Sequence, residues 1–338
     1  MTHEIKCLFQ TLAQWQQLNK KAVLVTVVGL EGSSYRRPGV RMVINENGDS
    51  VGAVSGGCVE GEISRQAQTV FQRGTSKMIT YDGRFRLGCD GNILILIEPV
   101  FLSYELINAF SKALKKRLPF SMKAYFKSSV GEYENLGTLC ELNGESYSLN
   151  PNFNPKKIED QQSFVQSFDP PFQLYIFGAE HDAVHLCKSA ALLGWDVTVV
   201  ASPDDSKTIE FFPGAKSIIT PSFGEINQSL FDKQTAIVMM THSLNKDVQY
   251  LLALKDVTPA YLGLLGSVKR RERILSSLLE FNPELSIDFL DQIHGPAGIN
   301  VGVETAEEIA VSVLAEILSV IRRQEPIALR NKTGSIHG

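Results

Sequence analysis

The chain contains little that would assign it to a specialised class of protein. Only five of its 338 residues are cysteines, and their spacing includes no Cys-x-x-Cys motif and suggests no disulfide framework. Sparse, scattered cysteine is typical of a reducing compartment and argues against a structural zinc site. No apolar run approaches the roughly 18 residues that a transmembrane helix needs, so we expect no integral membrane contact.

Basic charge is also scarce. Lysine and arginine together number 33 against 37 acidic residues, which gives a net charge of −4. Proteins that bind nucleic acid usually carry a basic excess, so we expect no nucleic-acid partner. The first 21 residues lack the apolar core and cleavage site of a signal peptide and instead predict an amphipathic helix. We therefore expect a cytoplasmic protein, long enough for two hydrophobic cores.

Residues 29–62 are the most informative stretch of the chain, with eight glycines, three arginines and Cys58. Glycine lets a backbone approach a ligand closely, and arginine presents a rigid fork of donors to oxyanions. Cys58 comes just before a predicted helix, where a thiolate is favoured. The stretch predicts an anion-binding loop, although solvated arginines on a surface turn remain an alternative. The candidate anion ligands are Ser33, Ser34, Arg36, Arg37, Arg41, Gly56 and Gly57.

The N-terminal half predicts an α+β domain with a mixed sheet over residues 1–149. Asn47-Gly48 predicts a hairpin turn, and a second hairpin around Asn143-Gly144 forms a small extension. Residues 150–171 are rich in Asn, Pro, Gln and Ser and predict a linker. The expected strands are 22–28, 40–44, 50–54, 78–81 and 93–98, and the expected helices are 60–73 and 103–117.

From residue 172 strands alternate with helices, which predicts a Rossmann-like domain with a doubly wound parallel sheet over 172–324. Thr305 and Glu308 form a capping box that predicts a closing helix at 306–323. Residues 325–338 form a tail. The expected strands are 174–177, 196–200, 217–219, 236–240 and 261–265.

Gly178 begins the turn at which a Rossmann fold binds a pyrophosphate. The dinucleotide fingerprint requires glycine where this chain has Glu180, and a carboxylate there repels phosphate. The second strand is followed by Ala201, where an acid would bind the ribose. Both departures weaken binding of NAD(P), which leaves an NAD(P)-dependent oxidoreductase as an alternative only.

Histidines also mark the expected carboxyl edge of this sheet. His181 and His185 are four residues apart on one helix face, and His242 follows the fourth strand. A metal-dependent hydrolase around His181 and His242 is a further alternative, for which the sequence supplies no clear third ligand.

Several spaced motifs resemble the xanthine dehydrogenase accessory (XdhC/CoxI) family. The first half carries SSYRRPGVRM, VGAVSGGCVEGEI and LGCDGNILILIEP, and the second carries IFGAEHDAVHLCKSAALLGWDVTVV, IVMMTHSLNKD and IHGPAGINVGVETAEEIAVSVLAEI, in the family's order. The resemblance covers roughly residues 5–120 and 172–322. It implies a maturation factor, in preference to an enzyme, that transiently binds molybdopterin, the molybdenum cofactor, and serves its sulfuration and insertion.

On this resemblance Gly178, His181 and His242 join the cofactor-binding residues. Cys58 and Cys89, each set among glycines beside an acid, are candidates to ligate molybdenum or to relay sulfur, with inert packing as the alternative. We expect Cys7, Cys140 and Cys187 to be inert and buried. The implied partners are an apo molybdenum hydroxylase of the xanthine dehydrogenase type and a cysteine desulfurase, and we also expect a homodimer.

Overall fold

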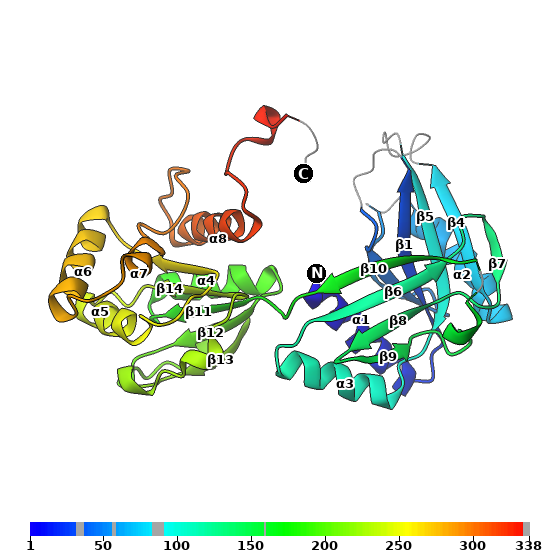
Figure 1. Cartoon of the computed structure of the whole chain (residues 1–338), viewed down its shortest axis with the longest axis horizontal. Helices are drawn as coiled ribbons and strands as arrows, with labels where there is room; N and C mark the ends of the chain where they lie inside the picture. The colour runs from blue at the N-terminus through cyan, green and yellow to red at the C-terminus, as the bar shows by residue number, and fades with distance from the viewer. Residues whose placement is uncertain (32–36, 56–58, 83–90, 159, 334–338) are drawn as a thin grey trace. The chain divides into compact units, whose positions relative to one another are not determined.

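The computed structural model describes residues 1–31, 37–55, 59–82, 91–158 and 160–333 (Figure 1). The chain divides into two compact units, Met1–Pro170 and Pro171–Gly338. Within the described ranges, no helix is both long and apolar enough to cross a membrane.

Two antiparallel sheets build the N-terminal unit. The α+β class is the predicted one, but every described strand pair is antiparallel. The sheet is thus more regular than the mixed sheet that we expected. The larger sheet runs β3 (Ser50–Gly52), β2 (Arg41–Asn45), β1 (Ala22–Glu31), β5 (Asn92–Val100), β4 (Ser76–Asp82), β7 (Gly131–Tyr133). The smaller runs β10 (Gln162–Phe168), β6 (Phe120–Phe126), β8 (Gly137–Leu142), β9 (Glu145–Ser148).

The local signals of this unit correspond to real turns and helix ends. β2 and β3 form the predicted hairpin, with Gly48 at φ 92°. Helix α2 (Glu60–Arg73) ends at Gly74, whose φ of 69° suits glycine. Helix α3 (Tyr104–Lys115) begins at Ser103, whose hydroxyl accepts from the Leu106 amide.

The segment 150–171 is not simply the linker that its composition predicts. Residues Gln162–Phe168 form β10, which pairs with β6 along its whole length. Asn150 is buried and its amide donates to Ser76 Oγ at 3.0 Å and to the Leu136 carbonyl at 2.8 Å. An edge strand of an antiparallel sheet exposes one face to water, so its Gln and Ser residues resemble linker composition.

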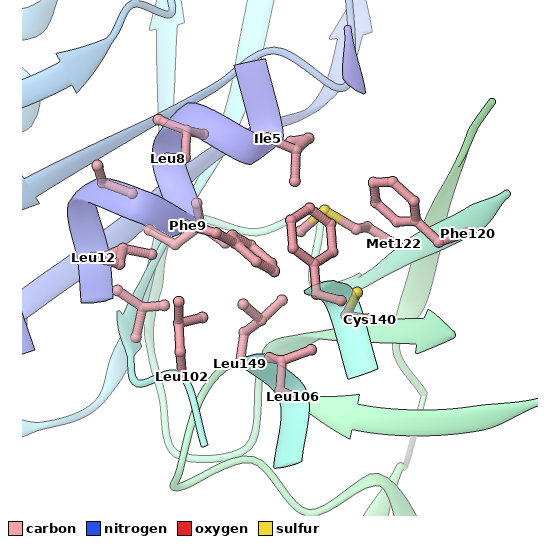
Figure 2. Packing of buried hydrophobic residues seen from close by; sticks show 14 of the residues in the cluster. Ile5, Leu8, Phe9, Leu12, Leu102, Leu106, Phe120, Met122, Cys140 and Leu149 are labelled. Carbon is pink, nitrogen blue, oxygen red and sulfur yellow. The ribbon is translucent and has the colours of Figure 1, made fainter. Parts of the chain in front are cut away.

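One core of the N-terminal unit lies beneath α1 (Thr2–Gln17), as Figure 2 shows. Ile5, Leu8, Phe9 and Leu12 project from one face of α1 because they recur at helical spacing. They meet Met122 of β6 and residues of α3 and β8. On its other face the larger sheet packs against α2.

The C-terminal unit has the predicted parallel sheet, with β16 as a sixth strand beyond the five that we expected. Its order is β13 (Ala215–Ile219), β12 (Asp196–Val200), β11 (Gln173–Phe177), β14 (Thr235–Met239), β15 (Tyr261–Leu264), β16 (Ile293–His294). Helices α4 (His181–Leu192) and α8 (Ala306–Arg322) cover one face. Helices α5 (Leu244–Ala253), α6 (Val268–Phe281) and α7 (Ile287–Asp291) cover the other. From β11 the chain adds strands in one direction, to β12 and β13, and from β14 it adds them in the opposite direction, to β15 and β16. Open α/β sheets bind ligands at such a switch point.

Candidate functional site

The carboxyl ends of β11 and β14 form the floor of one candidate site. Gly178 follows β11 at φ 128°, and a Cβ there would lie 2.4 Å from the Met240 carbonyl oxygen. Only glycine therefore allows the two strand ends to approach this closely. The loops that leave them carry the sequence-predicted residues His181 and His242.

The structure brings His242 to Asp182, not to a second histidine. His242 adopts a left-handed conformation at φ 56°, and its Nε2 lies 3.7 Å from Asp182 Oδ2 at the start of α4. His181 is exposed, and its ring packs edge-on against His185 with centroids 4.7 Å apart. His185 Nδ1 lies 3.3 Å from Glu307 of α8.

These pairings bear on the metal-dependent hydrolase interpretation. His242 and His185 each lie beside a single carboxylate, and among the residues that the structure describes no three His, Cys, Asp or Glu side chains gather to hold a metal ion. The described part of this edge therefore provides no metal centre.

A cavity of about 550 Å³ opens at this edge of the sheet. Its lining combines Asp182 and His242 with Arg270 of α6 and with apolar residues that include Met240 and Leu265. Mostly apolar walls with a few convergent polar groups are typical of small-molecule sites.

Glu180 is less of an obstacle to anions than its position in the fingerprint predicts. It is the N-cap residue of α4, and its side chain is 46% exposed. Lys207 Nζ lies 3.8 Å from Glu180 Oε2 and 3.4 Å from Asp205 Oδ2, which offsets part of the negative charge. Ala201, which follows β12, is fully buried and offers no acid for a ribose. Ala201 therefore disfavours NAD(P) binding more than Glu180 does.

A buried ion pair stabilises this edge of the sheet. The sequence did not predict it. Asp247 is fully buried and accepts from Arg270 Nη2 at 2.6 Å. Its other oxygen accepts from Thr241 Oγ1 at 2.6 Å and from the Thr241 amide at 3.3 Å. Arg270 therefore uses its charge on a carboxylate of its own chain. The ion pair joins α5 to α6, and the hydrogen bonds from Thr241 attach the loop after β14 to it.

A second polar cluster fixes the loop after β16, which contributes Pro296 and Ala297 to the cavity. Glu316 of α8 accepts from Tyr261 Oη at 2.5 Å and from the Gly298 amide at 2.7 Å, and lies 3.4 Å from His294 Nδ1. Burial opposes ionisation of Glu316, but these hydrogen bonds outweigh it and lower its pKa. The cluster therefore positions a wall of the cavity.

The second candidate site is the arginine–glycine region of the N-terminal unit. Ser33, Ser34, Arg36, Gly56, Gly57, Cys58 and Cys89 lie outside the described residues. The two remaining arginines differ sharply, because Arg37 is exposed whereas Arg41 is only 5% exposed. Arg41 Nη1 donates to the Gly39 carbonyl at 2.8 Å and to Gln166 Oε1. The two guanidinium groups do not share one solvent-facing surface.

The described residues that flank these segments meet at one end of the larger sheet. Asn92 of β5 pairs with Glu31 of β1 on one side and with Asp82 of β4 on the other. Glu31, which precedes segment 32–36, and Asp82, which precedes segment 83–90, are therefore both partners of Asn92, on opposite sides of β5. This register could not be read from the sequence, since it depends on which strands become neighbours.

The carboxylate of Glu60 binds both residues that flank the third segment, 56–58. Its carboxylate accepts from the Ser55 amide at 2.7 Å, from Ser55 Oγ at 2.6 Å and from the Val59 amide at 3.2 Å. Partial burial opposes ionisation of Glu60, but these hydrogen bonds outweigh it and lower its pKa. Val54 and Val59 belong to the same core as Val27 and Ile93, near the end of the sheet described above.

The remaining cysteines correct one expectation. Cys140 and Cys187 are buried as expected, and burial raises the pKa of their thiols to about 12 and about 11. Cys7 is exposed, contrary to our prediction. It lies on α1 between Ile5 and Leu8, whose spacing defines the buried stripe and leaves Cys7 on the outer face.

The chain belongs to the XdhC/CoxI family. Residues 174–317 match the XdhC Rossmann domain, and residues 15–82 match the XdhC and CoxI family. The chain is 30% identical to a Bacillus subtilis protein whose name describes it as a probable subunit of xanthine dehydrogenase, over 90% of this chain and 94% of that protein.

Two further similarities extend over most of the chain. It is 29% identical to the "Molybdenum cofactor insertion chaperone PaoD" of Escherichia coli, over 90% of this chain and 85% of that protein. A crystal structure of a protein described as a xanthine dehydrogenase from Bacillus halodurans superposes with a TM-score of 0.74 at 26% identity. That similarity covers 94% of this chain and 96% of the other.

Proposed function

We propose that this protein binds the molybdenum cofactor, supports its sulfuration and inserts it into an apo molybdenum hydroxylase of the xanthine dehydrogenase type. The observation that carries the proposal is the meeting of the flanking residues Glu31, Asp82 and Asn92 at one end of the larger N-terminal sheet. Asn92 lies opposite both Glu31 and Asp82 there, so the segments with Arg36 and with Cys89 leave the same end of the sheet.

Hydrogen bonds hold the two residues that flank the segment with Cys58. Glu60 holds Ser55 and Val59, the residues on either side of it, through three hydrogen bonds. A loop closed at its base loses less conformational entropy on binding than a free one, because its ends are already fixed. This arrangement supports a preorganised site for the segment with Gly56, Gly57 and Cys58.

The residue types in these segments suit the two ends of a pterin cofactor. Arginine forks and backbone amides bind the terminal phosphate, and the proposed ligands are Ser33, Ser34, Arg36, Arg37, Gly56 and Gly57. Thiolates are soft ligands, so Cys58 and Cys89 would approach the molybdenum or carry sulfur to it. The cofactor is cargo here, bound and then released to the client enzyme.

In the C-terminal unit the proposed contributors are Gly178, His181 and His242. The cavity beside His242 combines that histidine with Asp182 and Arg270, which gives donors and an acceptor for a polar ligand. A second candidate is an NAD(P)-dependent oxidoreductase, which is favoured by the start of α4, where Lys207 offsets part of the charge of Glu180. Quenching of NAD(P)H fluorescence by the protein tests that candidate separately.

Three finer points belong to the proposal. We infer a cysteine desulfurase as the sulfur donor, a homodimer as the working assembly and the cytoplasm as the compartment. The relative named as an insertion chaperone supports the general role.

Reconstitution of a client enzyme tests the proposal. The full chain, loaded with molybdenum cofactor, is mixed with an apo molybdenum hydroxylase, and recovered hydroxylase activity is followed in time. We expect faster recovery than with free cofactor, and slower recovery with Cys58→Ser or Cys89→Ser. Arg65→Ala, at an exposed position of α2, is the matched control and should behave as the native chain. Equal rates with free and loaded cofactor would contradict the role.

A further inference from the structure

The cavity at the carboxyl edge of the C-terminal sheet contains a carboxylate that is free to accept hydrogen bonds. Asp182 of α4 lines it, and the side chain of Asp182 is 25% exposed. Its Oδ2 lies 3.7 Å from His242 Nε2, which is too long for a hydrogen bond, and the described part of the chain supplies no other partner. Neither oxygen is a buried atom without a partner, so both are accessible. A ligand in the cavity can therefore donate to Asp182.

Hydrogen-bond donors line the same cavity. Arg270 of α6 uses Nη2 to donate to Asp247, and a guanidinium has further N–H donors. No nitrogen of Arg270 is buried without a partner, so these further donors reach the surface. His242 has a side chain that is 59% exposed, and its Nε2 is beside Asp182. Ser312 also lines the cavity, but its hydroxyl donates to the Ile299 carbonyl at 2.6 Å. The cavity thus places an acceptor beside donors.

The charges around the cavity disfavour an anionic ligand. Asp247 forms an ion pair with Arg270 at 2.6 Å and offsets its positive charge. With His242 neutral, the carboxylate of Asp182 leaves this lining with a net negative charge. A phosphate or carboxylate bound here would be repelled by that charge, and burying two like charges together costs free energy. The lining therefore favours a neutral ligand that donates N–H groups.

The walls and the polar groups together select a flat heterocycle. The volume of about 550 Å³ is within the usual range for small-molecule sites. The apolar part of the lining is Met240, Leu265, Pro296, Ala297, Val303 and Ile309. A carboxylate accepts two parallel hydrogen bonds from an amino group and a neighbouring N–H. An aminopyrimidinone ring presents an amino group, a ring N–H and a carbonyl oxygen in that order along one edge, which matches an acceptor beside donors.

We propose that this cavity binds an aminopyrimidinone ring, the edge that pterin and guanine share. The amino group and the ring N–H donate to Asp182, and the carbonyl oxygen accepts from His242 and Arg270. The inference rests on the proposed function, which makes the pterin of the molybdenum cofactor the expected source of the ring. Asp182 is then the residue that selects the ring, a role that neither the family resemblance nor the dinucleotide fingerprint assigns to it.

Fluorescence titration of the full chain with free pterin tests the site. Lumazine is the matched probe, because it is the same bicycle with a carbonyl in place of the amino group. We expect lumazine to bind at least tenfold more weakly, since its extra carbonyl oxygen would face the Asp182 carboxylate. Asp182→Asn should weaken pterin at least tenfold and abolish the preference, because an amide can donate to lumazine. Asp256→Asn, the same change at an exposed position, should alter neither affinity.

A second variant tests the cavity without changing its polar groups. Val303 lines the cavity and is 37% exposed, so Val303→Phe can narrow the cavity without disturbing the core. It should weaken both compounds and leave their ratio unchanged. Equal binding of pterin and lumazine by the native chain would overturn the proposal, as would a preference for pterin that survives Asp182→Asn. Guanosine that binds more tightly than pterin would assign the site to a guanine nucleotide and overturn its link to the cofactor.

The two proposals can fail separately. Free pterin carries neither phosphate nor molybdenum, so its binding does not depend on the arginines or thiols proposed for the cofactor. A native chain that selects pterin over lumazine but does not speed cofactor insertion would contradict the proposed function alone. A native chain that speeds insertion without that selectivity would contradict the present inference alone.

Discussion

The ion pair between Asp247 and Arg270 should be asymmetric in its effect on stability. Asp247 is fully buried, whereas the side chain of Arg270 is 24% exposed. Arg270→Leu leaves a buried carboxylate with only Thr241 as its partner, and removing one member of a buried pair costs about 3–5 kcal/mol. Asp247→Asn leaves a guanidinium that water can reach, and we expect a cost of about 1–2 kcal/mol.

The double variant separates a charge effect from a packing effect. Asp247→Asn with Arg270→Leu has no uncompensated buried charge, so it should be more stable than Arg270→Leu alone. Lys246→Met is the matched control, because it breaks an exposed ion pair of 3.3 Å with Asp204. Exposed pairs of this kind contribute about 0–1 kcal/mol.

Urea unfolding followed by tryptophan fluorescence measures these changes unit by unit. The chain has two tryptophans, Trp15 in the N-terminal unit and Trp195 in the C-terminal unit. In a Trp15→Phe background only Trp195 reports. With m of about 1–3 kcal/mol/M, a loss of about 3 kcal/mol lowers the urea midpoint by about 1 M or more. A midpoint for Arg270→Leu equal to that of Lys246→Met would refute the reasoning, as would a double variant less stable than Arg270→Leu.

Three further predictions concern the rest of the chain. Gly178→Ala should destabilise the C-terminal unit by about 1–3 kcal/mol, since its Cβ would lie 2.4 Å from a backbone oxygen, whereas Gly224→Ala, with open space around it, should have little effect. Burial raises the pKa of Glu98 from 4.5 to about 7, so the free energy of unfolding should fall by about 3 kcal/mol as the pH rises from about 4.5 to 7. Glu98→Gln should flatten that dependence, and an unchanged slope would contradict the assignment. A short iodoacetamide pulse should modify exposed Cys7 before buried Cys140 and Cys187, and bound cofactor should protect Cys58 and Cys89 without protecting Cys7, as mass spectrometry can determine.

Local signals predicted much of the fold. The alternation of apolar strands and helices after residue 172 indicated the parallel sheet, and Thr305 with Glu308 marked the start of α8. The turn at Asn47-Gly48 and the helix end at Gly74 follow from backbone preferences of a few residues. Such features need no knowledge of distant parts of the chain.

The remaining features depend on tertiary placement. β10 escaped notice because an exposed edge strand tolerates Gln and Ser. Asp247 and Arg270 are 23 residues apart, and no local pattern marks them as partners. Arg41 was expected to bind an anion, but β2 is buried along its whole length and leaves it no solvent-facing side. In the candidate site, the sequence indicated residue types that suit an anion, but it did not indicate that Arg41 is buried while Arg37 is exposed.

The most direct test of the central claim is the molybdenum and pterin content of the purified full chain from cells that make the cofactor. The account predicts that pterin and molybdenum elute with the protein in comparable molar amounts. Replacing both Arg36 and Arg37 by Ala should reduce the bound pterin at least tenfold, because hydrogen bonds to charged groups contribute about 1.5–3 kcal/mol each. Protein that carries neither pterin nor molybdenum, or a double variant that retains both in full, would contradict the account.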